Sequence, residues 1–288
     1  SYSVTGVQTC ALPIWSSKNE LLVFTSLRHS ISRRYYKGGS PISNQPIKRS
    51  FYNYQNFSIT YGLLNRLSVH SEIGYFYNKV QDVEIAGDDI QIRSHGLGDL
   101  AVNLRYIPIK TVSPTSLLLI SGGIKIPIGE FNEEMSGVTI PISLQPSSGA
   151  IKYNASVFYS IKPSGAKLGW NSLAMFETSK TIEKGYLVYT YGNYFQYALA
   201  CAWLPVRELS FTLNVKFEWR DRDKRENNIK VVSTGSHIIY LNPQFTYVFA
   251  GEWSILAMAD FPFYKHVNGE QLTNMYSFQI GLRKNIVF

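Results

Sequence analysis

The chain has 288 residues, and its 28 Lys and Arg residues against 20 Asp and Glu residues give a formal net charge of +8. Charged residues make up only 17% of the sequence, well below the roughly 25% of a typical soluble domain. The basic residues are scattered and no nucleic-acid-binding motif accompanies them, so we expect no nucleic-acid partner. No uncharged apolar run approaches the roughly 18 residues of a transmembrane helix.

The first segment is unlike the rest of the chain. Residues 4–14 read VTGVQTCALPI, and when they are read back into codons they resemble a common short-read sequencing adapter translated in frame. The alternative is a degenerate remnant of a signal peptide. We therefore expect residues 1–14 to be an artefactual or disordered segment, with the native N-terminus and any signal peptide missing, and residues 15–288 to form one domain. Without Cys10, Cys201 has no disulfide partner, and neither a multi-Cys metal site nor a cofactor is expected.

The remaining chain alternates between apolar and polar residues, which is the period of a β-strand and not of a helix. In LSFTLNVKFEW, the six odd-numbered residues from Leu209 to Trp219 are apolar and the five residues between them are polar. Tyr and Phe, which favour strands, number 20 and 16. The pattern predicts twelve strands, at about 20–36, 50–62, 66–79, 90–107, 115–128, 148–162, 167–181, 185–203, 207–221, 235–249, 253–265 and 271–288.

Strand length and loop asymmetry distinguish a membrane barrel from a soluble sandwich. Most predicted strands exceed the roughly five or six residues usual in globular proteins. The connections near residues 64, 163, 204 and 250 are tight, whereas EFNEEMSGVTIPISLQPS is the longest loop. Short turns at one end and long loops at the other are typical of an outer-membrane barrel with both termini in the periplasm. We therefore predict an all-β protein, a transmembrane antiparallel β-barrel of about twelve strands, located in the bacterial outer membrane and surrounded by its lipid and lipopolysaccharide.

Aromatic residues and the C-terminus support this prediction. Aromatic side chains cluster near the predicted strand ends, as in the girdles of membrane barrels: Tyr35, Tyr36, Tyr75, Tyr77, Tyr106, Tyr186, Tyr189, Trp203, Trp219, Trp253, Phe261, Phe263 and Tyr264. The segment MYSFQIGLRKNIVF ends on Phe288 after alternating apolar positions, and it resembles the C-terminal strand that the barrel-assembly machinery recognises. Lys284 departs from that pattern and has to extend toward the interface. An ordinary terminal edge strand is the alternative.

Two motifs resemble a known family. GLGDLAVNLRY is followed by SGGIKIPIGEFN, and this pair resembles the Gly-Asp-Leu and Gly-Gly-hydrophobic-Lys strands of the outer-membrane transporter-like family named after the meta-pathway of phenol degradation. Ile128 stands where that family often has Thr. The resemblance implies a barrel for uptake of small, often hydrophobic molecules, without a catalytic residue. In physical terms, Gly96, Gly98, Gly122 and Gly123 predict bulges, bends or relief of crowding within strands.

Alternation also predicts which charged side chains line the lumen. An ion pair between Asp99 and Lys125, and another between Lys216 and Glu218, are expected there. Because basic residues exceed acidic ones and a twelve-stranded barrel has a narrow bore, we expect any open state to prefer anions or polar organic solutes. The predicted lumen-lining residues are Arg28, Glu72, Asp99, Arg105, Lys125, Lys152, Glu177, Lys216, Glu218, Arg220, Asp260 and Arg283, together with the basic residues Arg34, Arg93 and Lys162.

Three classes of function follow from a barrel. A channel or transporter for uptake of small solutes is the first. A structural or adhesion barrel, with its function in loops such as RDRDKREN, is the second. An outer-membrane lipid hydrolase or acyltransferase is the third, but Ser236 and His237 are neighbours on a strand and face opposite sides, so they do not meet as nucleophile and base. His70 and Glu72 share the inward face and are expected to form a luminal pair. No catalytic residue is assigned, and the substrate is left open.

Overall fold

The computed structural model describes residues 16–43, 46–85, 87–112, 115–135, 137–185, 187–249 and 253–288. The predictions for residues 1–14 and Tyr186 concern positions outside these ranges. Within them, no helix has both the length and the apolar character that a membrane span requires. The described elements are two short 3-10 helices, η1 (Ile142–Leu144) and η2 (Glu226–Asn228), and the strands β1 (Glu20–Gly38), β2 (Ser40–Ile42), β3 (Ile47–Leu64), β4 (Leu67–Ile85), β5 (Asp88–Leu97), β6 (Leu100–Val112), β7 (Thr115–Ile126), β8 (Glu134–Met135), β9 (Val138–Thr139), β10 (Lys152–Lys162), β11 (Leu168–Ser179), β12 (Ile182–Lys184), β13 (Leu187–Thr190), β14 (Tyr194–Val206), β15 (Leu209–Arg220), β16 (Lys224–Arg225), β17 (Ser236–Phe249) and β18 (Trp253–Val287).

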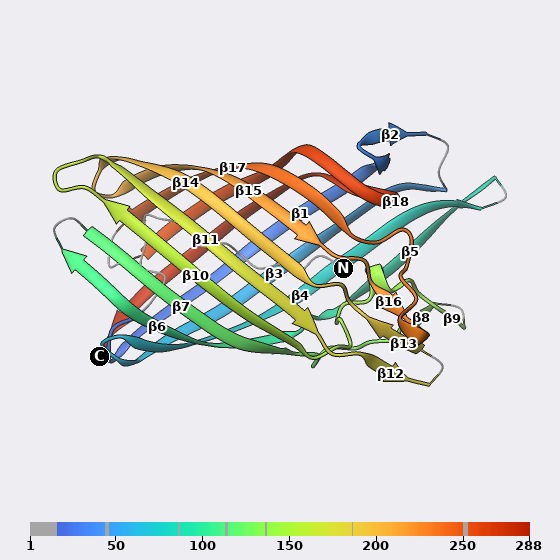
Figure 1. Cartoon of the computed structure of the whole chain (residues 1–288), viewed down its shortest axis with the longest axis horizontal. Coiled ribbons are helices and arrows are strands. Elements are labelled where there is room, and N and C mark those ends of the chain that lie inside the picture. Colours follow the sequence, from blue (N-terminus) through green and yellow to red (C-terminus); the bar gives the residue numbers. More distant parts are fainter. Residues whose placement is uncertain are drawn as a thin grey trace.

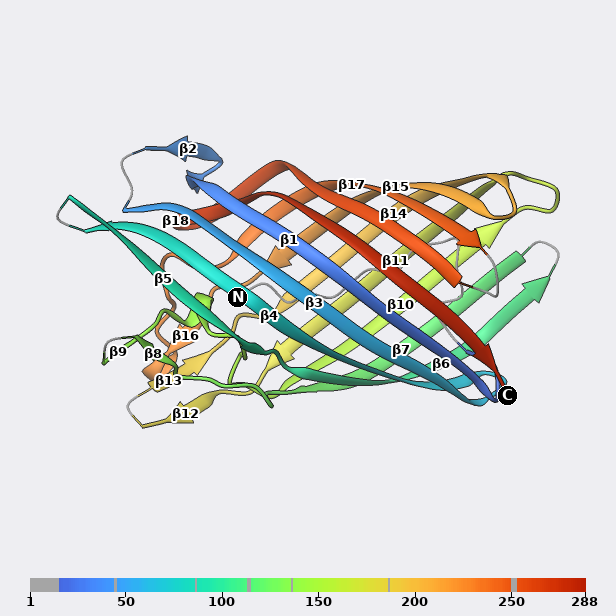
Figure 2. The same ribbon diagram turned by 180° about the vertical axis from the view of Figure 1, so that it is seen from behind.

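Most of the strands form one antiparallel barrel (Figures 1 and 2). The main sheet of the described residues has 13 strands, and pairing of β18 with β1 closes it. Strands β2 and β5 pair with the ends of β1 and β4, and the other eleven strands form the ring. A closed ring leaves no unpaired edge, which is the condition for a sheet to stay stable in lipid. The predicted fold class, a transmembrane antiparallel β-barrel, is confirmed.

The last strand crosses the barrel twice. Strand β18 has 35 residues; its first part pairs with β17, from Phe249↔Trp253 to Ser236↔Val267, and its last part pairs with β1, from Gly38↔Val267 to Glu20↔Val287. The chain reverses next to Gly269, which has a φ of +59°, a conformation that glycine adopts without strain. The strands predicted at 253–265 and 271–288 are therefore the two halves of β18. With this reversal, the described barrel wall has the twelve crossings that the sequence predicts.

The two ends of the barrel differ. Short connections, such as those between β3 and β4 and between β14 and β15, lie at the end where the C-terminus lies, which we call the turn end (Figure 1). The other end, the loop end, carries a small sheet of β12, β13 and β16 and the hairpin of β8 and β9. This asymmetry agrees with the loop pattern of the sequence.

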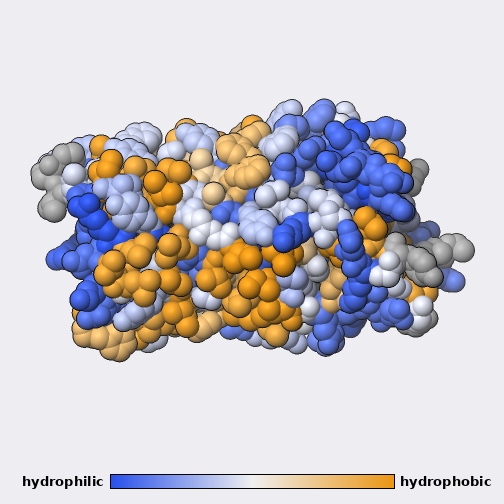
Figure 3. All heavy atoms as spheres, turned by 60° about the horizontal axis from the view of Figure 1, so that its bottom comes forward, coloured by the Kyte–Doolittle hydropathy of each residue, from blue (hydrophilic) through white to orange (hydrophobic). Residues whose placement is uncertain are grey.

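Side chains alternate between the lumen and the outer wall, with the polarity of a soluble protein reversed. On β15, Asn214 is 3% exposed and Leu213 is 49% exposed, and the same contrast continues along the strand. Orange, hydrophobic residues cover much of the surface toward the turn end, whereas the loop end at the right is mostly blue (Figure 3). Burial of the polar side and exposure of the apolar side stabilise a barrel only when lipid surrounds it. The molecule therefore spans a membrane.

Irregularities in two strands reverse which side chains face the lumen beyond them. Two residues that were predicted to line the lumen lie elsewhere for this reason. Arg34 is exposed, because the register of β1 shifts between Ser32 and Arg34. Arg93 is also exposed, whereas its neighbour Ser94 is buried. Gly96, near the end of β5, has a φ of +139°, and the wall is interrupted between β5 and β6. Alternation counted back from Arg105 on β6 therefore assigns the wrong side to Arg93 on β5. The luminal prediction for Arg34 and Arg93 is therefore wrong.

Candidate functional site

The connection between β7 and β10 folds into the barrel at its loop end. The described residues of this segment, 127–135 and 137–151, include the short helix η1 and are called the plug below. Leu144, Gln145 and Ser147 of the plug are 2%, 3% and 2% exposed, although they belong to a loop. A buried loop needs partners for its backbone groups, so the plug must be held by the wall around it.

Polar side chains of the wall supply these partners. The Lys79 ammonium donates a 2.7 Å hydrogen bond to the Gln145 carbonyl, and the Ser94 hydroxyl donates to the Leu144 carbonyl. Asp99 accepts from the Ser147 hydroxyl at 2.7 Å and from the backbone N–H of Ser148 at 2.9 Å. The plug is therefore fixed to β4, β5 and the junction before β6.

The Gln145 side chain holds the plug in its folded form. Its amide nitrogen donates to the carbonyls of Ile140 and Glu133, and its oxygen accepts from the backbone N–H of Glu133 at 2.9 Å. One side chain thus links the two arms of the loop.

The small sheet of β12, β13 and β16, together with the residues next to its strands, is called the cap below. The cap packs against the plug. Tyr189, Tyr191 and Ile182 of the cap form an apolar cluster with Ala150 and Phe131 of the plug segment. The Tyr191 hydroxyl donates to the Ser148 carbonyl at 2.8 Å. The cap and the plug therefore share one core.

Asp223 holds the cap together. One carboxylate oxygen accepts from the Tyr189 hydroxyl, the other accepts from the backbone N–H of Gly192 at 2.7 Å, and its own N–H donates to Thr234. Burial, followed by the neighbouring Asp223 charge, raises the pKa of the Tyr189 phenol above its ordinary value, so this hydroxyl stays a donor.

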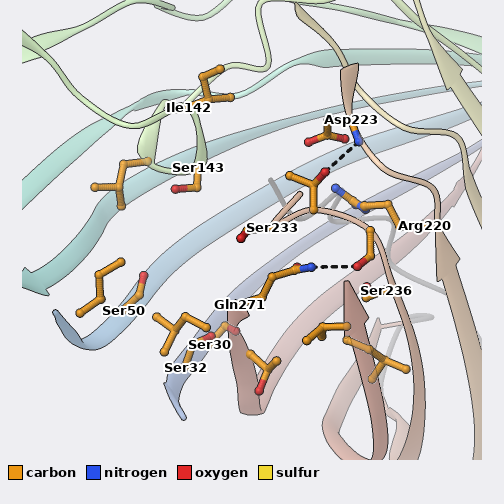
Figure 4. Close-up of a pocket in the computed structure, with 18 of the residues that line it drawn as sticks. Ser30, Ser32, Ser50, Ile142, Ser143, Arg220, Asp223, Ser233, Ser236 and Gln271 are labelled. Carbon is orange, nitrogen blue, oxygen red and sulfur yellow. Dashed lines mark hydrogen bonds between the residues drawn. The ribbon is translucent and has the colours of Figure 1, made fainter. Parts of the chain in front are cut away.

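A chamber of about 370 Å³ lies in the lumen between the plug, the cap and the barrel wall. Figure 4 shows its serine side chains, with Arg220 on one side and Ser143 of the plug on another. Hydrogen bonds from Asp223 to Thr234 and from Gln271 to the Gly235 carbonyl order one wall. The rings that line the chamber are Tyr35, Phe51, Tyr52, Phe76, Tyr189, Tyr191, Tyr194 and Tyr240. Aromatic faces together with hydroxyl groups suit a small amphipathic molecule.

Lys79 lies in the lumen, although it is not among the lumen-lining residues that alternation predicts. The predicted strand 66–79 ends on it, and a register shift between Asn53 and Tyr54 against β4 decides the side to which it turns. Lys79 is 9% exposed, and its ammonium lies 4.7 Å from the centre of the Phe76 ring. It lines both the chamber and a smaller cavity of about 80 Å³ beneath the plug.

The predicted ion pair between Asp99 and Lys125 does not form in this way. Asp99 is engaged by the plug, and Lys125 instead pairs with Glu177, whose other oxygen lies 3.7 Å from Lys152. Strand β10 separates β7 from β11 in the sheet, so the long side chains reach across one strand. The resulting triad of Lys125, Glu177 and Lys152 lies near the plug, at the loop end of these strands.

A second network crosses the middle of the lumen. Asp260 pairs with Arg28 at 2.8 Å and with Lys216 at 3.2 Å, and Lys216 also pairs with Glu218 at 2.9 Å. Asn242 and Ser277 donate further hydrogen bonds to Asp260. The pair of Lys216 and Glu218 is found as expected.

The other predicted lumen residues take separate positions. Arg220 lies in the chamber wall, 5.4 Å from the centre of the Tyr194 ring. Glu72, Arg105 and Arg283 lie closer to the turn end on β4, β6 and β18, and Arg283 is 9% exposed. The Glu72 carboxylate lies 3.6 Å from His70 Nε2.

An apolar cluster lies on the inward face of the wall near the turn end. Ile107, Leu119 and Phe158 are buried together on β6, β7 and β10, and Leu117 and Leu173 pack against them. Polar residues otherwise dominate the inward face. The plug therefore lies in the lumen near the loop end, and this apolar cluster lies on the inward face near the turn end.

Groups that resemble catalytic arrangements are either separated or enclosed. Ser236 lines the chamber, whereas the His237 ring packs near Trp219 and His266. His70 Nδ1 lies 2.9 Å from the Thr60 hydroxyl and its Nε2 lies 3.6 Å from Glu72, but Thr60 is 0% exposed. Among the described residues, no group of three or more His, Cys, Asp or Glu side chains is arranged to hold a metal ion.

The glycines of the two family-like motifs have distinct roles. Gly96 and Gly98 lie at the break between β5 and β6. A Cβ on Gly123 would lie 2.3 Å from the Val102 carbonyl of β6, so close strand approach requires glycine there.

Comparison with solved structures shows that the fold is similar to that of an outer membrane channel. No protein-family model and no curated protein matches this chain. An outer membrane channel of Pseudomonas putida F1 is similar in structure, with a TM-score of 0.75 and 11% identity over 99% of this chain and 100% of that one. Two further structures are similar, with lower TM-scores. A deletion mutant of the TodX monoaromatic hydrocarbon channel has a TM-score of 0.49 and 7% identity, over 95% of this chain and 91% of that chain. A Pseudomonas aeruginosa FadL homologue has a TM-score of 0.44 and 9% identity, over 92% and 90%.

Proposed function

We propose that this protein is a bacterial outer-membrane channel that takes up small organic solutes. The observation that supports this proposal best is the chamber of about 370 Å³ between plug and cap, since a purely structural barrel needs no amphipathic cavity in its lumen. Its volume lies within the ~300–1,000 Å³ of small-molecule sites. The solute enters the chamber at the loop end and continues toward the turn end when the plug moves.

The fold is shared with an outer membrane channel of Pseudomonas putida F1, which supports the same proposal. We also propose membership in the transporter-like family named after the meta-pathway of phenol degradation, on the two glycine-containing motifs at residues 96–106 and 121–132. Lipopolysaccharide and outer-membrane lipid surround the barrel in this proposal, and the barrel-assembly machinery inserts it.

A reversible lock on the plug tests the channel function. Asp99 and Ser147 are in direct contact at 2.7 Å, so Asp99→Cys together with Ser147→Cys, with Cys10 and Cys201 changed to Ser, positions two thiols for a disulfide. We expect solute-driven swelling of proteoliposomes to stop on oxidation and to return on reduction. The Cys-free parent protein is the control. Swelling that is unaffected by a verified cross-link contradicts a path through the plug, and no swelling by any folded form contradicts a channel.

A further inference from the structure

Lys79 differs in its partners from three other buried lysines of the lumen. Lys125, Lys152 and Lys216 each have a carboxylate within 4 Å. Among the described residues, no carboxylate oxygen lies within 4 Å of the Lys79 ammonium. Its ammonium bonds instead to the neutral Gln145 carbonyl and lies over the Phe76 ring. A buried cation with no carboxylate within 4 Å is costly, so this position favours a further anion.

The position of Lys79 joins ligand binding to the plug. Its side chain lines the chamber, where a solute is expected, and also the cavity beneath the plug. Its hydrogen bond to the plug ends on Gln145, which directly follows the chamber-lining residues 142–144. An acceptor in the chamber therefore competes with the Gln145 carbonyl for the same ammonium.

The chamber wall indicates the chemistry of such an acceptor. A carboxylate forms stronger hydrogen bonds with an ammonium than a backbone carbonyl does, because its charge assists the bond. Arg220 provides a second cationic group in the wall beside the Tyr194 ring. The acidic residues of the wall are engaged elsewhere: Glu218 with Lys216, Glu270 with Lys37, and Asp223 with Tyr189. The aromatic rings around these cations suit a planar apolar body.

We infer that the chamber binds a small organic carboxylate with a planar apolar body, and that Lys79 then exchanges its bond to Gln145 for a bond to this carboxylate, which releases one fastening of the plug. This inference rests on the proposed channel function and adds the ligand class and its coupling to the gate. No covalent step is involved. Asp99 and Ser94 still hold the plug after the exchange, so the ligand lowers the barrier to opening and does not remove it.

Binding is measured first, by calorimetry on the purified full chain in detergent. Benzoate is the probe, and benzamide is its neutral analogue of the same shape. We expect benzoate to bind the wild type at least about tenfold more tightly than benzamide, since the ionised partner strengthens the hydrogen bond. Lys79→Met loses this preference and Lys79→Arg retains most of it. Lys162→Met is the matched control, because Lys162 also donates to a backbone carbonyl, that of Ala166, but near the turn end.

Gating is measured second, in planar bilayers. Benzoate is expected to raise the open probability of the wild type severalfold, and benzamide is not. Lys79→Met is expected to open more often without benzoate and to show no response to it. Equal binding of benzoate and benzamide by the wild type, or an unchanged benzoate response in a folded Lys79→Met protein, overturns the inference. Benzoate binding by a protein that conducts in no state instead refutes the channel function and leaves the carboxylate site intact.

Discussion

Arg28 and Asp260 are 232 residues apart in the chain, and their side chains meet at 2.8 Å inside the barrel. Arg28 belongs to β1 and Asp260 to the first half of β18, so the contact spans the second half of β18 that lies between them. Lys216, Asn242 and Ser277 share the same carboxylate. The region where the first and last strands meet is thus stabilised from the lumen as well as by the backbone.

Asp260→Ala is expected to destabilise the barrel by about 3–5 kcal/mol, because it leaves two buried cations without their shared carboxylate. Asp260→Asn keeps part of the hydrogen bonding and is expected to cost less. Unfolding by denaturant, followed by the heat-dependent shift in gel mobility, measures both. Asp88→Ala at the exposed rim serves as the control. Equal stabilities of the Ala variants at 88 and 260 contradict a structural role for this network.

Leu213→Lys is expected to reduce insertion into bilayers, since Leu213 is 49% exposed on the outer wall and a lysine near the middle of the bilayer costs about 2–4 kcal/mol. Folding yield into lipid vesicles measures the effect. A Leu213→Ala protein controls for loss of side-chain volume. If lysine and alanine insert equally well, this wall does not face lipid.

Asp99→Ala is expected to increase conductance, because it removes both hydrogen bonds from the wall to Ser147 and Ser148. The matched control is Asp82→Ala, which removes a carboxylate on β4 that binds Arg49 and not the plug. Single-channel recordings compare the two. A plug that stays closed in the Asp99 variant indicates that the contacts of Lys79, Ser94 and the cap are sufficient.

Open states are expected to prefer anions. Among the charged residues assigned to the lumen, the basic ones (Arg28, Lys79, Arg105, Lys125, Lys152, Lys216, Arg220 and Arg283) outnumber the acidic ones (Glu72, Asp99, Glu177, Glu218 and Asp260), and basic rings favour anions. The reversal potential under a salt gradient measures the preference. Lys216→Glu with Arg105→Glu is expected to shift it toward cations. Cation preference of the unaltered channel excludes this electrostatic model.

Deletion of Phe288 is expected to reduce insertion in cells, as the C-terminal strand resembles an assembly signal. The Phe288 side chain is 75% exposed, and its backbone N–H donates to the Asn19 carbonyl at 3.1 Å. The amount of protein in outer-membrane fractions gives the result. Deletion of residues 1–14 is the companion variant and is expected to leave insertion unchanged, so the two truncations must differ for both expectations to hold.

The barrel wall follows from local sequence patterns, which is why it was predictable. Alternation along β15 fixes which side chains face lipid, and it needs no knowledge of the neighbouring strands. The predicted strand 235–249 agrees with β17 (Ser236–Phe249) to within one residue at its start. The predicted strand 185–203 is instead divided between β13 in the cap and β14 in the wall, because Tyr189 turns into the core shared with the plug.

The site depends on bulges and on contacts between strands and loops, and alternation along a single strand predicts neither. A bulge adds one residue and reverses the inward phase, which moved Arg34 outward. The longest loop was recognised, but its inward course depends on distant acceptors and donors such as Lys79 and Asp99. Partner choice among luminal charges likewise depends on which strands are neighbours, so Lys125 meets Glu177.

Because β18 contributes both of the last two crossings, closure of the barrel must come late in assembly. Until the 35 residues of β18 have paired with both neighbours, β1 and β17 each expose an unpaired edge, and a chain that ends before β18 is an open sheet with two such edges. Open edges pair readily with other chains. A chain that ends near Trp253 would therefore be an aggregation-prone product and not a smaller channel.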